Sequence, residues 1–490
     1  MLSRVGPVGI PLLALALSSA SGCTPYPARG PVGDFFMKDY DLPPYEQGEA
    51  EFQRRRRQIA PDLATGALGG MPGAFAGGRL RAWRVSAGGT LGGLGGAAVG
   101  WSHSRAEHET LLPETYELFS LGLPIVATDP NTGVTLGVLP VAIFKEGDRI
   151  TNILAPDVTY NEIQGVGGTF RMRRYFSRDA TLAVDAGTSS KGAQDYEGIY
   201  SQRRVGPDQT LFYRARFAYR TTLAERFYGI GNETEEEAES TYTFRRTTGE
   251  AVLGVQLPLS LSLELRERVV SYKLGPGRLS DVASTRVAFP EVKGVLDGRV
   301  TILAHQVRLA YDTRDSFTAP TEGVFAELLY EVSDSTLGSD IQFQKFSGQV
   351  TLLVPKLNKR LTTAARLAGW FVKGDEVPFW ELTQLGGKET HRGYGQGRFV
   401  GQNGWVVNVE ERFNAFFLNA VGTDLVIQLA GFLDLGRVYD DDESLTFSDL
   451  KLAVGGAVRL VVPDSELVTS IDLGISDEGT AVFVGLDYPF

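Results

Sequence analysis

The chain has 490 residues, of which 43% are hydrophobic and 22% charged, and this composition is typical of a folded protein. Its formal charge of −11 argues against nonspecific nucleic-acid binding, because binding to phosphate groups needs a basic surface. The 27 phenylalanines and 18 tyrosines favour β structure, and the single cysteine excludes a disulfide framework and a cysteine-based zinc site.

Residues 1–22 have the pattern of a signal peptide, with Arg4, an apolar run over Ile10–Leu17 and small residues before Cys23. This pattern resembles a bacterial lipoprotein signal, in which Cys23 would be lipidated and become the mature N-terminus. The alternative is a simple secretory signal with an incidental cysteine. Both interpretations predict that the chain is exported.

Two segments separate this signal from the rest of the chain. Residues 23–62 are rich in proline and charge and are predicted to form a lipoprotein tether, and residues 63–110 are rich in glycine. Small residues at spacings of three and four let helices approach closely, so a glycine-zipper hairpin and a low-complexity linker both remain open for residues 63–110. We therefore expect a short irregular or partly helical N-terminal segment.

Residues 111–490 alternate like β-strands. In one example, Leu211, Tyr213 and Phe217 lie on one face while Arg214 and Arg216 lie on the other. The predicted strands are 132–144, 149–160, 164–176, 179–188, 209–221, 241–256, 260–274, 299–312, 320–333, 341–354, 359–373, 399–413, 424–435, 449–461, 467–475 and 480–490.

The length and charge of these strands favour a membrane barrel over a soluble sandwich. Most run to about ten residues or more, which is the length of a tilted transmembrane strand. Charges recur on one face of successive strands, as expected for a wet interior behind a lipid-facing exterior. The fold class is therefore predicted to be all-β, with residues 111–490 forming a sixteen-stranded antiparallel transmembrane β-barrel.

The last predicted strand has one apolar face made of Val482, Val484, Leu486, Tyr488 and Phe490. This row resembles the C-terminal signal of outer-membrane barrels, which Tyr488 and Phe490 would carry. It adds an outer-membrane location to the prediction of a barrel.

Residues 385–399 hold five glycines in fifteen positions, between two strand-like runs. Glycine costs ordering entropy and leaves no side chain to pack, so this stretch is predicted to be a loop. Arg392 stands near its centre and could reach a distant partner without steric interference. The alternative from composition is an ordinary flexible surface loop.

Four stretches together resemble the BamA-type and TamA-type barrels of the bacterial surface antigen superfamily, and in particular its lipoprotein members without POTRA domains. The resemblance covers about the last 180 residues. The four stretches are Arg392-Gly393-Tyr394, Tyr311 to Asp315 with Pro320 to Gly323, Glu410 to Arg412 with Phe432 to Gly436, and the ending at Phe490.

The resemblance implies that the loop folds into the barrel and places the guanidinium of Arg392 against acidic partners. Strand parity turns Glu410 to the same face as Asn408 and Arg412, and the same argument turns Asp434 inward. The predicted site therefore consists of Arg392, Gly393 and Tyr394 on the loop, with Glu410 and Asp434 as its partners. The alternative is that these are unconnected interior charges.

The resemblance implies a non-enzymatic barrel that assists insertion or translocation of proteins, or of lipid, through a seam between its first and last strands. Gly133 and Gly137 in the first predicted strand would weaken pairing at that seam. The alternative is a passive pore or a structural lipoprotein barrel. The residues between Cys23 and the first strands are too glycine-rich to resemble a POTRA domain, which puts client capture by such domains in doubt.

The chain shows no pattern that predicts a catalytic, cofactor-binding or metal site. The four histidines are scattered through the sequence, and no Gly-x-Ser-x-Gly motif is present. The expected partners are outer-membrane lipids and client outer-membrane proteins, and no nucleic acid.

Overall fold

The computed structural model describes residues 116–490 apart from short gaps at 130, 147–148, 178, 293, 295–297, 317–318, 375, 421–422, 441–447, 463–466 and 487. The signal peptide, Cys23, the tether and the glycine-rich segment of residues 63–110 lie outside the described residues and stay predictions.

The described residues form one large antiparallel sheet, a small two-stranded sheet and four short helical segments in the connections. The strands are β1 (Tyr116–Asp129), β2 (Gly133–Glu146), β3 (Arg149–Leu154), β4 (Asp157–Asn161), β5 (Gly165–Tyr175), β6 (Ala180–Ser189), β7 (Gln194–Val205), β8 (Leu211–Phe227), β9 (Ser240–Leu257), β10 (Leu261–Pro276), β11 (Ala283–Ser284), β12 (Arg299–Asp312), β13 (Gly323–Ser333), β14 (Phe343–Lys356), β15 (Leu361–Lys373), β16 (Thr383–Leu385), β17 (Phe399–Gly401), β18 (Asn403–Ala420), β19 (Thr423–Tyr439), β20 (Lys451–Val462), β21 (Leu467–Ser476) and β22 (Gly479–Leu486). The helical segments are η1 (Glu236–Ala238), α5 (Thr285–Ala288), η2 (Ser335–Leu337) and η3 (Phe379–Glu381).

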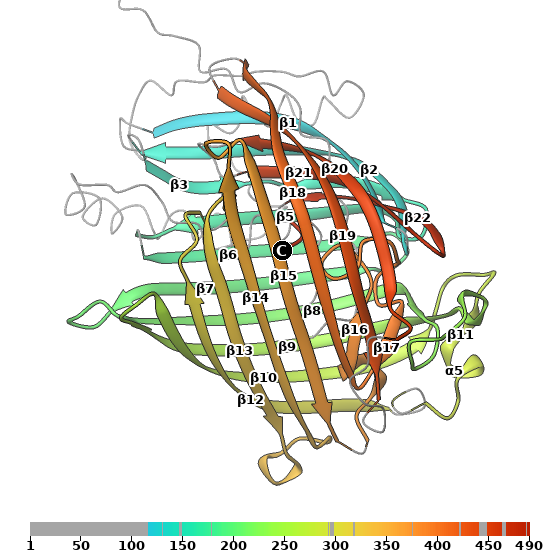
Figure 1. Ribbon diagram of the computed structural model, residues 1–490. Helices are drawn as coiled ribbons and strands as arrows, with labels where there is room; N and C mark the ends of the chain where they lie inside the picture. Colours follow the sequence, from blue (N-terminus) through green and yellow to red (C-terminus); the bar gives the residue numbers. More distant parts are fainter. Residues whose placement is uncertain are drawn as a thin grey trace, which may run out of the picture.

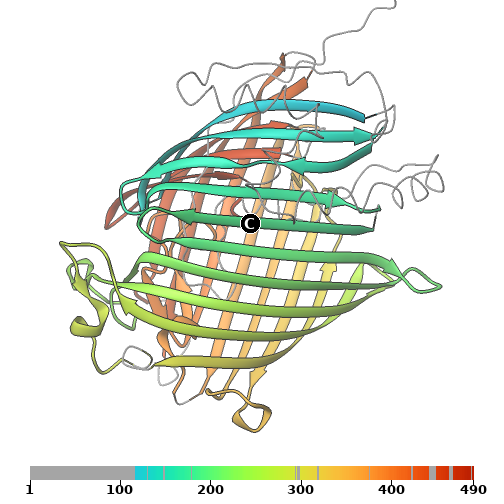
Figure 2. The ribbon, with the colours of Figure 1, turned by 180° about the vertical axis from the view of Figure 1, so that it is seen from behind.

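The large sheet is a meander that curls round until its last strand, β22, lies beside its first, β1 (Figure 1). β3 and β4 both pair with β2 on one side and β5 on the other, so they are two parts of one strand, interrupted at Ala155 and Pro156. Proline there cannot donate to the ladder. Figure 2 shows the wall of β5 to β12 from behind. Within the described part of the chain, no helix is long and apolar enough to cross a membrane.

The all-β antiparallel fold is as predicted, but the count of sixteen strands is not confirmed. The sheet contains two long strands that were not predicted, β1 and β7. In β1 the apolar residues run consecutively over Leu123–Ala127, which hides the period of two. In β7 polar residues fall on both faces, and Gly198 interrupts the outer one. Pairing with neighbouring strands therefore decided both elements, not their own pattern.

The first strand is also different from the one predicted. β1 pairs with β2 along its whole length, from Tyr116 opposite Glu146 to Asp129 opposite Gly133. The glycines of β2 therefore do not lie at the junction of first and last strands. That junction is between β1 and β22, and in the described residues no ladder joins them. We call this junction the seam.

Each long strand turns one face inward and one outward, as the alternation predicts. On β8, Phe217 is 57% exposed on the outer face, whereas Arg216 and Arg220 are buried on the inner one. The inner charges pair across neighbouring strands: Arg216 with Glu197, and Arg220 with Asp195 at 2.8 Å. Interior charges thus meet opposite charges on the next strand, which offsets the cost of burying them.

The two ends of the barrel differ. One end carries the connection between β15 and β18, residues 374–402, and we call it the loop end. At the other, the turn end, β1 begins and β22 ends. The turn end includes the β12–β13 turn, where the Asp315 carboxylate accepts hydrogen bonds from Thr321 N, Thr321 Oγ1 and Glu322 N at 2.6 to 3.1 Å. Lys359 lies 3.1 Å from the same carboxylate.

Candidate functional site

The connection 374–402 folds into the barrel instead of projecting from it. It contains the small sheet of β16 and β17, and the stretch between them turns at Gly386 and Gly387, whose φ angles of +117° and +91° favour glycine. His391 N donates to Gly387 O at 3.0 Å and closes a tight turn. The loop predicted from five glycines is therefore an ordered, buried structure.

Arg392 projects from this turn against the wall formed by β18, β19 and β21. Its Nε and Nη2 donate to the two carboxylate oxygens of Asp434, each at 2.8 Å, and its main-chain N–H donates to the same carboxylate at 3.0 Å. Its Nη1 donates to Glu410 at 2.5 Å. The planar guanidinium matches two carboxylate oxygens at once, which a lysine ammonium could not do. The structure thus brings Arg392 together with both predicted acidic partners.

Three further wall residues complete a group that we call the Arg392 cluster. Arg459 donates to both oxygens of Glu410, at 2.6 and 2.9 Å, and to Asp472 at 3.0 Å. Arg412 Nε donates to Glu410 at 2.6 Å. The cluster consists of Arg392, Arg412, Arg459, Glu410, Asp434 and Asp472. Three guanidinium groups thus face three carboxylates, and every one of these side chains is at most 1% exposed.

The charge balance keeps the loop arginine ionised. Burial by itself would lower the pKa of Arg392, but the hydrogen bonds and charge of Asp434, with the charges of Glu410 and Asp472, raise that pKa above its ordinary value. Removing one member would leave a buried charge without compensation, which is far more costly than the loss of an exposed ion pair.

Aromatic rings cover the cluster and correct the prediction for the last strand. The centroid of the Phe432 ring lies 3.5 Å from Arg392 Cζ, and the centroid of the Tyr488 ring lies 3.9 Å from Arg412 Cζ. The main-chain oxygen of Phe490 accepts a hydrogen bond from Arg412 at 3.3 Å. The predicted strand 480–490 is therefore shorter in the structure, because β22 ends at Leu486 and the rings beyond it meet guanidinium groups inside the barrel.

Two glycines allow the loop to approach the wall. A Cβ on Gly393 would lie 2.5 Å from Ala453 Cβ, and a Cβ on Gly474 of β21 would lie 2.0 Å from the carbonyl oxygen of Arg392. Gly393 was part of the predicted motif, whereas Gly474 was missed. The motif Asp434-Leu435-Gly436 recurs as Asp472-Leu473-Gly474, a repeat that could have identified both Asp472 and Gly474 from the sequence.

Tyr394 and its neighbours tie the loop to the hairpin of β21 and β22. Tyr394 donates to Asp477 at 2.5 Å, and Ser476 donates to the carbonyl of Gly393 at 2.9 Å. Burial raises the pKa of the Tyr394 hydroxyl, and its hydrogen bond to Asp477 raises it further. His391 is fully buried with Nε2 2.7 Å from Lys451 O, and burial lowers the pKa of its imidazole.

The same connection has a second anchor that sequence reasoning missed, which we call the Glu381 cluster. The Glu381 carboxylate on η3 meets Arg268 at 3.3 Å, accepts a hydrogen bond from Tyr272 at 2.5 Å and pairs with Lys345. Arg268 also pairs with Glu331. Burial alone would raise the pKa of Glu381, but the charges of Arg268 and Lys345 lower it below its ordinary value.

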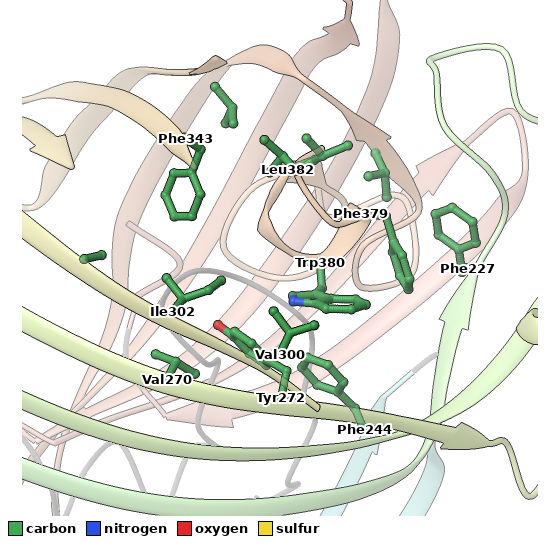
Figure 3. Close-up of a cluster of buried hydrophobic side chains, with 14 of the residues drawn as sticks. Phe227, Phe244, Val270, Tyr272, Val300, Ile302, Phe343, Phe379, Trp380 and Leu382 are labelled. Atoms are coloured by element: carbon green, nitrogen blue, oxygen red, sulfur yellow. The ribbon is translucent and has the colours of Figure 1, made fainter. Parts of the chain in front are cut away.

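An apolar cluster adjoins this second anchor, and Figure 3 shows its side chains. The Trp380 ring lies 5.6 Å from that of Phe244 and 5.7 Å from that of Tyr272, and the Phe379 ring lies 4.4 Å from that of Phe227, all between centroids. These aromatic side chains, with aliphatic residues of β10, β12 and β15, are buried inside the barrel. The wet interior predicted from the charge pattern is therefore filled by an apolar core near the loop end.

Arg398 joins the connection to the β8–β9 loop. Its guanidinium donates to Thr234 O at 2.6 Å and to Glu478 at 2.9 Å, and it lies 4.4 Å from the centroid of the Tyr228 ring. Nearby, Gly231 N donates to Val400 O at 2.7 Å. Segments far apart in sequence are thus held together at the loop end.

The contacts that fix the loop are mainly ion pairs. In the part of the chain that the structure describes, no group of three His, Cys, Asp or Glu residues could hold a metal ion. The carboxylates of the two clusters instead form ion pairs with arginine or lysine side chains.

The fold is thus a barrel of long antiparallel strands, with an interior loop bound to the wall through an arginine. The sequence model of the Omp85 superfamily domain matches residues 157–471, which is more than half of the chain. The chain therefore belongs to the Omp85 superfamily, and the predicted superfamily resemblance is confirmed. It is a protein of the Gram-negative outer membrane, and the non-enzymatic interpretation agrees with this membership.

Three solved structures are similar to the chain over most of its length. BamA from Haemophilus ducreyi lacking POTRA domains 1–3 is 14% identical, with a TM-score of 0.49 and 75% of each chain covered. CdiB from Acinetobacter baumannii is 12% identical (TM-score 0.40; 80% of this chain, 65% of that one), and CdiB from Escherichia coli is 13% identical (0.43; 79% and 66%). The chain thus spans less than two thirds of either CdiB. No curated protein matches it. Since these TM-scores lie below 0.5, the family assignment depends on the sequence match.

Proposed function

We propose that this barrel assists the insertion of proteins into the outer membrane, or their translocation across it, by loosening the seam between β1 and β22. Membership of the Omp85 superfamily supports the general role. The partners proposed are client outer-membrane proteins at the seam and outer-membrane lipids around the apolar outer face.

The observation that carries the seam is the missing ladder between β1 and β22. β22 pairs with β21 over eight residues and β1 pairs with β2 over fourteen, so in the described residues each of these two strands has a ladder on one side. β22 lies beside β1, but in the described residues the two share no ladder. Opening at this junction would break fewer main-chain hydrogen bonds than opening elsewhere in the wall.

The interior loop supports β22 from inside. Ser476, Asp477 and Glu478 at the β21–β22 turn bind Gly393, Tyr394 and Arg398 of the connection. This support lets the last hairpin keep its place without a ladder to β1. The predicted residues Arg392, Gly393, Tyr394, Glu410 and Asp434 are thus proposed to position the seam. Cys23 as a lipid anchor, and Tyr488 and Phe490 as a barrel signal, remain proposals too.

The test is a disulfide across the seam. Cysteines placed on β1 and β22 should, when oxidised, abolish assembly of a model barrel client in proteoliposomes, and reduction should restore it. The control is a disulfide between Ser120→Cys and Ala142→Cys, which face each other in the β1–β2 ladder and should leave assembly unchanged. Full assembly by the oxidised seam variant would refute the gate.

The alternative of a passive pore is less well supported by the interior. The Arg392 cluster and the apolar cluster around Trp380 occupy different parts of the barrel interior. Steady single-channel conductance by the wild-type protein, together with no assembly of the client, would favour the pore.

A further inference from the structure

The hairpin of β18 and β19 extends past the rest of the barrel wall at the turn end. β15 pairs with β18 as far as Leu361 opposite Phe413, and β20 pairs with β19 as far as Val461 opposite Val426. β18 and β19 nevertheless continue to pair with each other up to Ala420 opposite Thr423. Figures 1 and 2 show the two strands projecting at this end of the barrel.

This projection, residues 416–420 and 423–425, which we call the free hairpin, exposes the apolar side chains of Phe416, Phe417 and Leu418. Phe416, Phe417 and Leu418 are 59%, 64% and 47% exposed. A change of register between Asn414 and Phe416 precedes them, and such a bulge increases the local twist. An isolated two-stranded hairpin is only marginally stable in water. Contiguous exposed apolar side chains on such a hairpin are typical of a surface that binds a partner.

A charged pair separates the free hairpin from the apolar outer face of the wall. Glu411 lies on the outer face of β18 and binds Lys356 at 3.1 Å, and the side chains of both are more than two-fifths exposed. Charges are costly in hydrocarbon, so this pair indicates where the wall leaves the membrane core. At about 3.3 Å per residue, Phe416 lies roughly 16 Å further along the strand. Lipid tails therefore do not account for its exposed ring.

The outer edge of β18 is also free beyond the end of β15. Arg360 O accepts from Asn414 N at 2.9 Å, and the Arg360 guanidinium reaches Ala415 O at 3.4 Å. Past that point the described residues give β18 no neighbour on this side. Natural edge strands are commonly protected by charged residues or proline, but residues 413–423 contain neither.

We propose that the free hairpin docks an extended segment of an unfolded client, which adds as a strand along the edge of β18 beyond Phe413. This inference rests on the proposed function and names the surface that first receives the client. Main-chain hydrogen bonds would bind the segment, and Phe416 and Phe417 would contact its alternate side chains from the two faces. Lipid cannot pair with an open strand edge in this way, and a folded surface can do so where it has an open edge of its own.

The test measures binding of a strand peptide to the full-length protein in detergent. The probe is a fluorescent peptide with the sequence of Arg299–Asp312, which alternates as a barrel strand does, and a scrambled peptide is its control. Phe416→Ser combined with Phe417→Ser should raise the Kd at least tenfold. Leu259 is an apolar residue, 82% exposed, at the tip of the β9–β10 turn. Its change to serine, Leu259→Ser, should leave the Kd within twofold of the wild-type value. Equal affinity of the double variant and wild type would overturn the proposal.

A photo-reactive benzoylphenylalanine in place of Phe417 tests the contact without removing an aromatic ring. Cross-links to the peptide support docking. Cross-links to lipid alone, or to a second copy of the chain alone, would overturn it. Peptide binding is independent of seam opening. A barrel that assembles clients but does not bind the peptide at the hairpin therefore overturns this inference alone, and one that binds the peptide but assembles nothing overturns the proposed function.

Discussion

The Arg392 cluster and the Glu381 cluster hold the same connection against different parts of the barrel wall, with opposite signs. In the first, the loop supplies a cation and the wall supplies Glu410 and Asp434; in the second, the loop supplies a carboxylate and the wall supplies Arg268 and Lys345. The first is mainly ionic, with the rings of Phe432 and Tyr488 against its guanidinium groups. The second adjoins Trp380 in an apolar cluster, so charge and apolar burial share its contribution.

This contrast indicates how each anchor would fail. An ionic anchor loses its stabilisation when one charge is removed, because the remaining charges cannot reach water. An anchor that also buries aromatic rings retains part of its stabilisation after the same loss. The connection needs both anchors, because a loop of this length that is fixed at one anchor would still move at the position of the other anchor.

The largest effect is expected from Arg392→Ala. The change leaves three carboxylates facing two arginines in a space closed to water, and breaking a buried ion pair costs about 3–5 kcal/mol. We expect the temperature at which the folded form is lost, measured by heat-modifiable gel mobility, to fall more than for any other single change here. The transition temperature of Arg392→Lys should lie between those of Arg392→Ala and wild type, because lysine keeps the charge but not the bidentate pairing. An unchanged transition would contradict the role of the ionic anchor.

A smaller effect is expected from Glu381→Gln. The amide keeps the shape but removes the charge facing Arg268 and Lys345, and Trp380 stays buried, so the loss should be about 2–3 kcal/mol. The same melting measurement checks this. Combining Glu381→Gln with Arg392→Ala shows whether the anchors are independent: a loss within about 0.5 kcal/mol of the sum means that they are, and a larger departure means that they are coupled.

Gly474→Ala should loosen the Arg392 anchor alone. The added Cβ would lie 2.0 Å from the Arg392 carbonyl, so the loop backbone must shift, at a cost of about 1–2 kcal/mol. Limited trypsin digestion should then cut the connection faster than in wild type. The matched control is Gly431→Ala on β19, where nothing lies within 4 Å of the added Cβ. Equal digestion rates for the two variants would argue against close contact between loop and wall.

The smallest effect concerns pH and lies outside both anchors. Burial would raise the pKa of Asp315, but hydrogen bonds from Thr321, Glu322 and Lys359 lower it to about 2. Because the folded pKa is below the unfolded value of about 4, the carboxylate stabilises the fold above pH 4 and loses this contribution as the pH falls towards 2. Asp315→Asn should be less stable than wild type at pH 7, by less than about 1 kcal/mol because the side chain is partly exposed, and the difference should shrink as the pH falls from 4 and disappear below pH 2. A difference that persists well below pH 2 would contradict this cause.

The sequence alone determined the features that repeat with a short period or within a short motif. The period of two predicted which face of β8 turns inward, and the same parity placed Glu410 and Asp434 on the interior face. Their pairing with Arg392 was implied by the family resemblance. Side-chain direction in a strand follows from backbone geometry alone, so the prediction did not need the neighbouring strands.

Tertiary structure decided what depends on contacts between distant segments. Glu381 became an anchor because β10 and β14 place Arg268 and Lys345 beside it, and no local pattern marks that meeting. β1 and β7 became strands because their neighbours pair with them. The turn of Tyr488 towards Arg412, in place of a continued strand, has the same origin. Alternation fixes the direction of a side chain, whereas its partner depends on which strands the closing sheet brings to face one another.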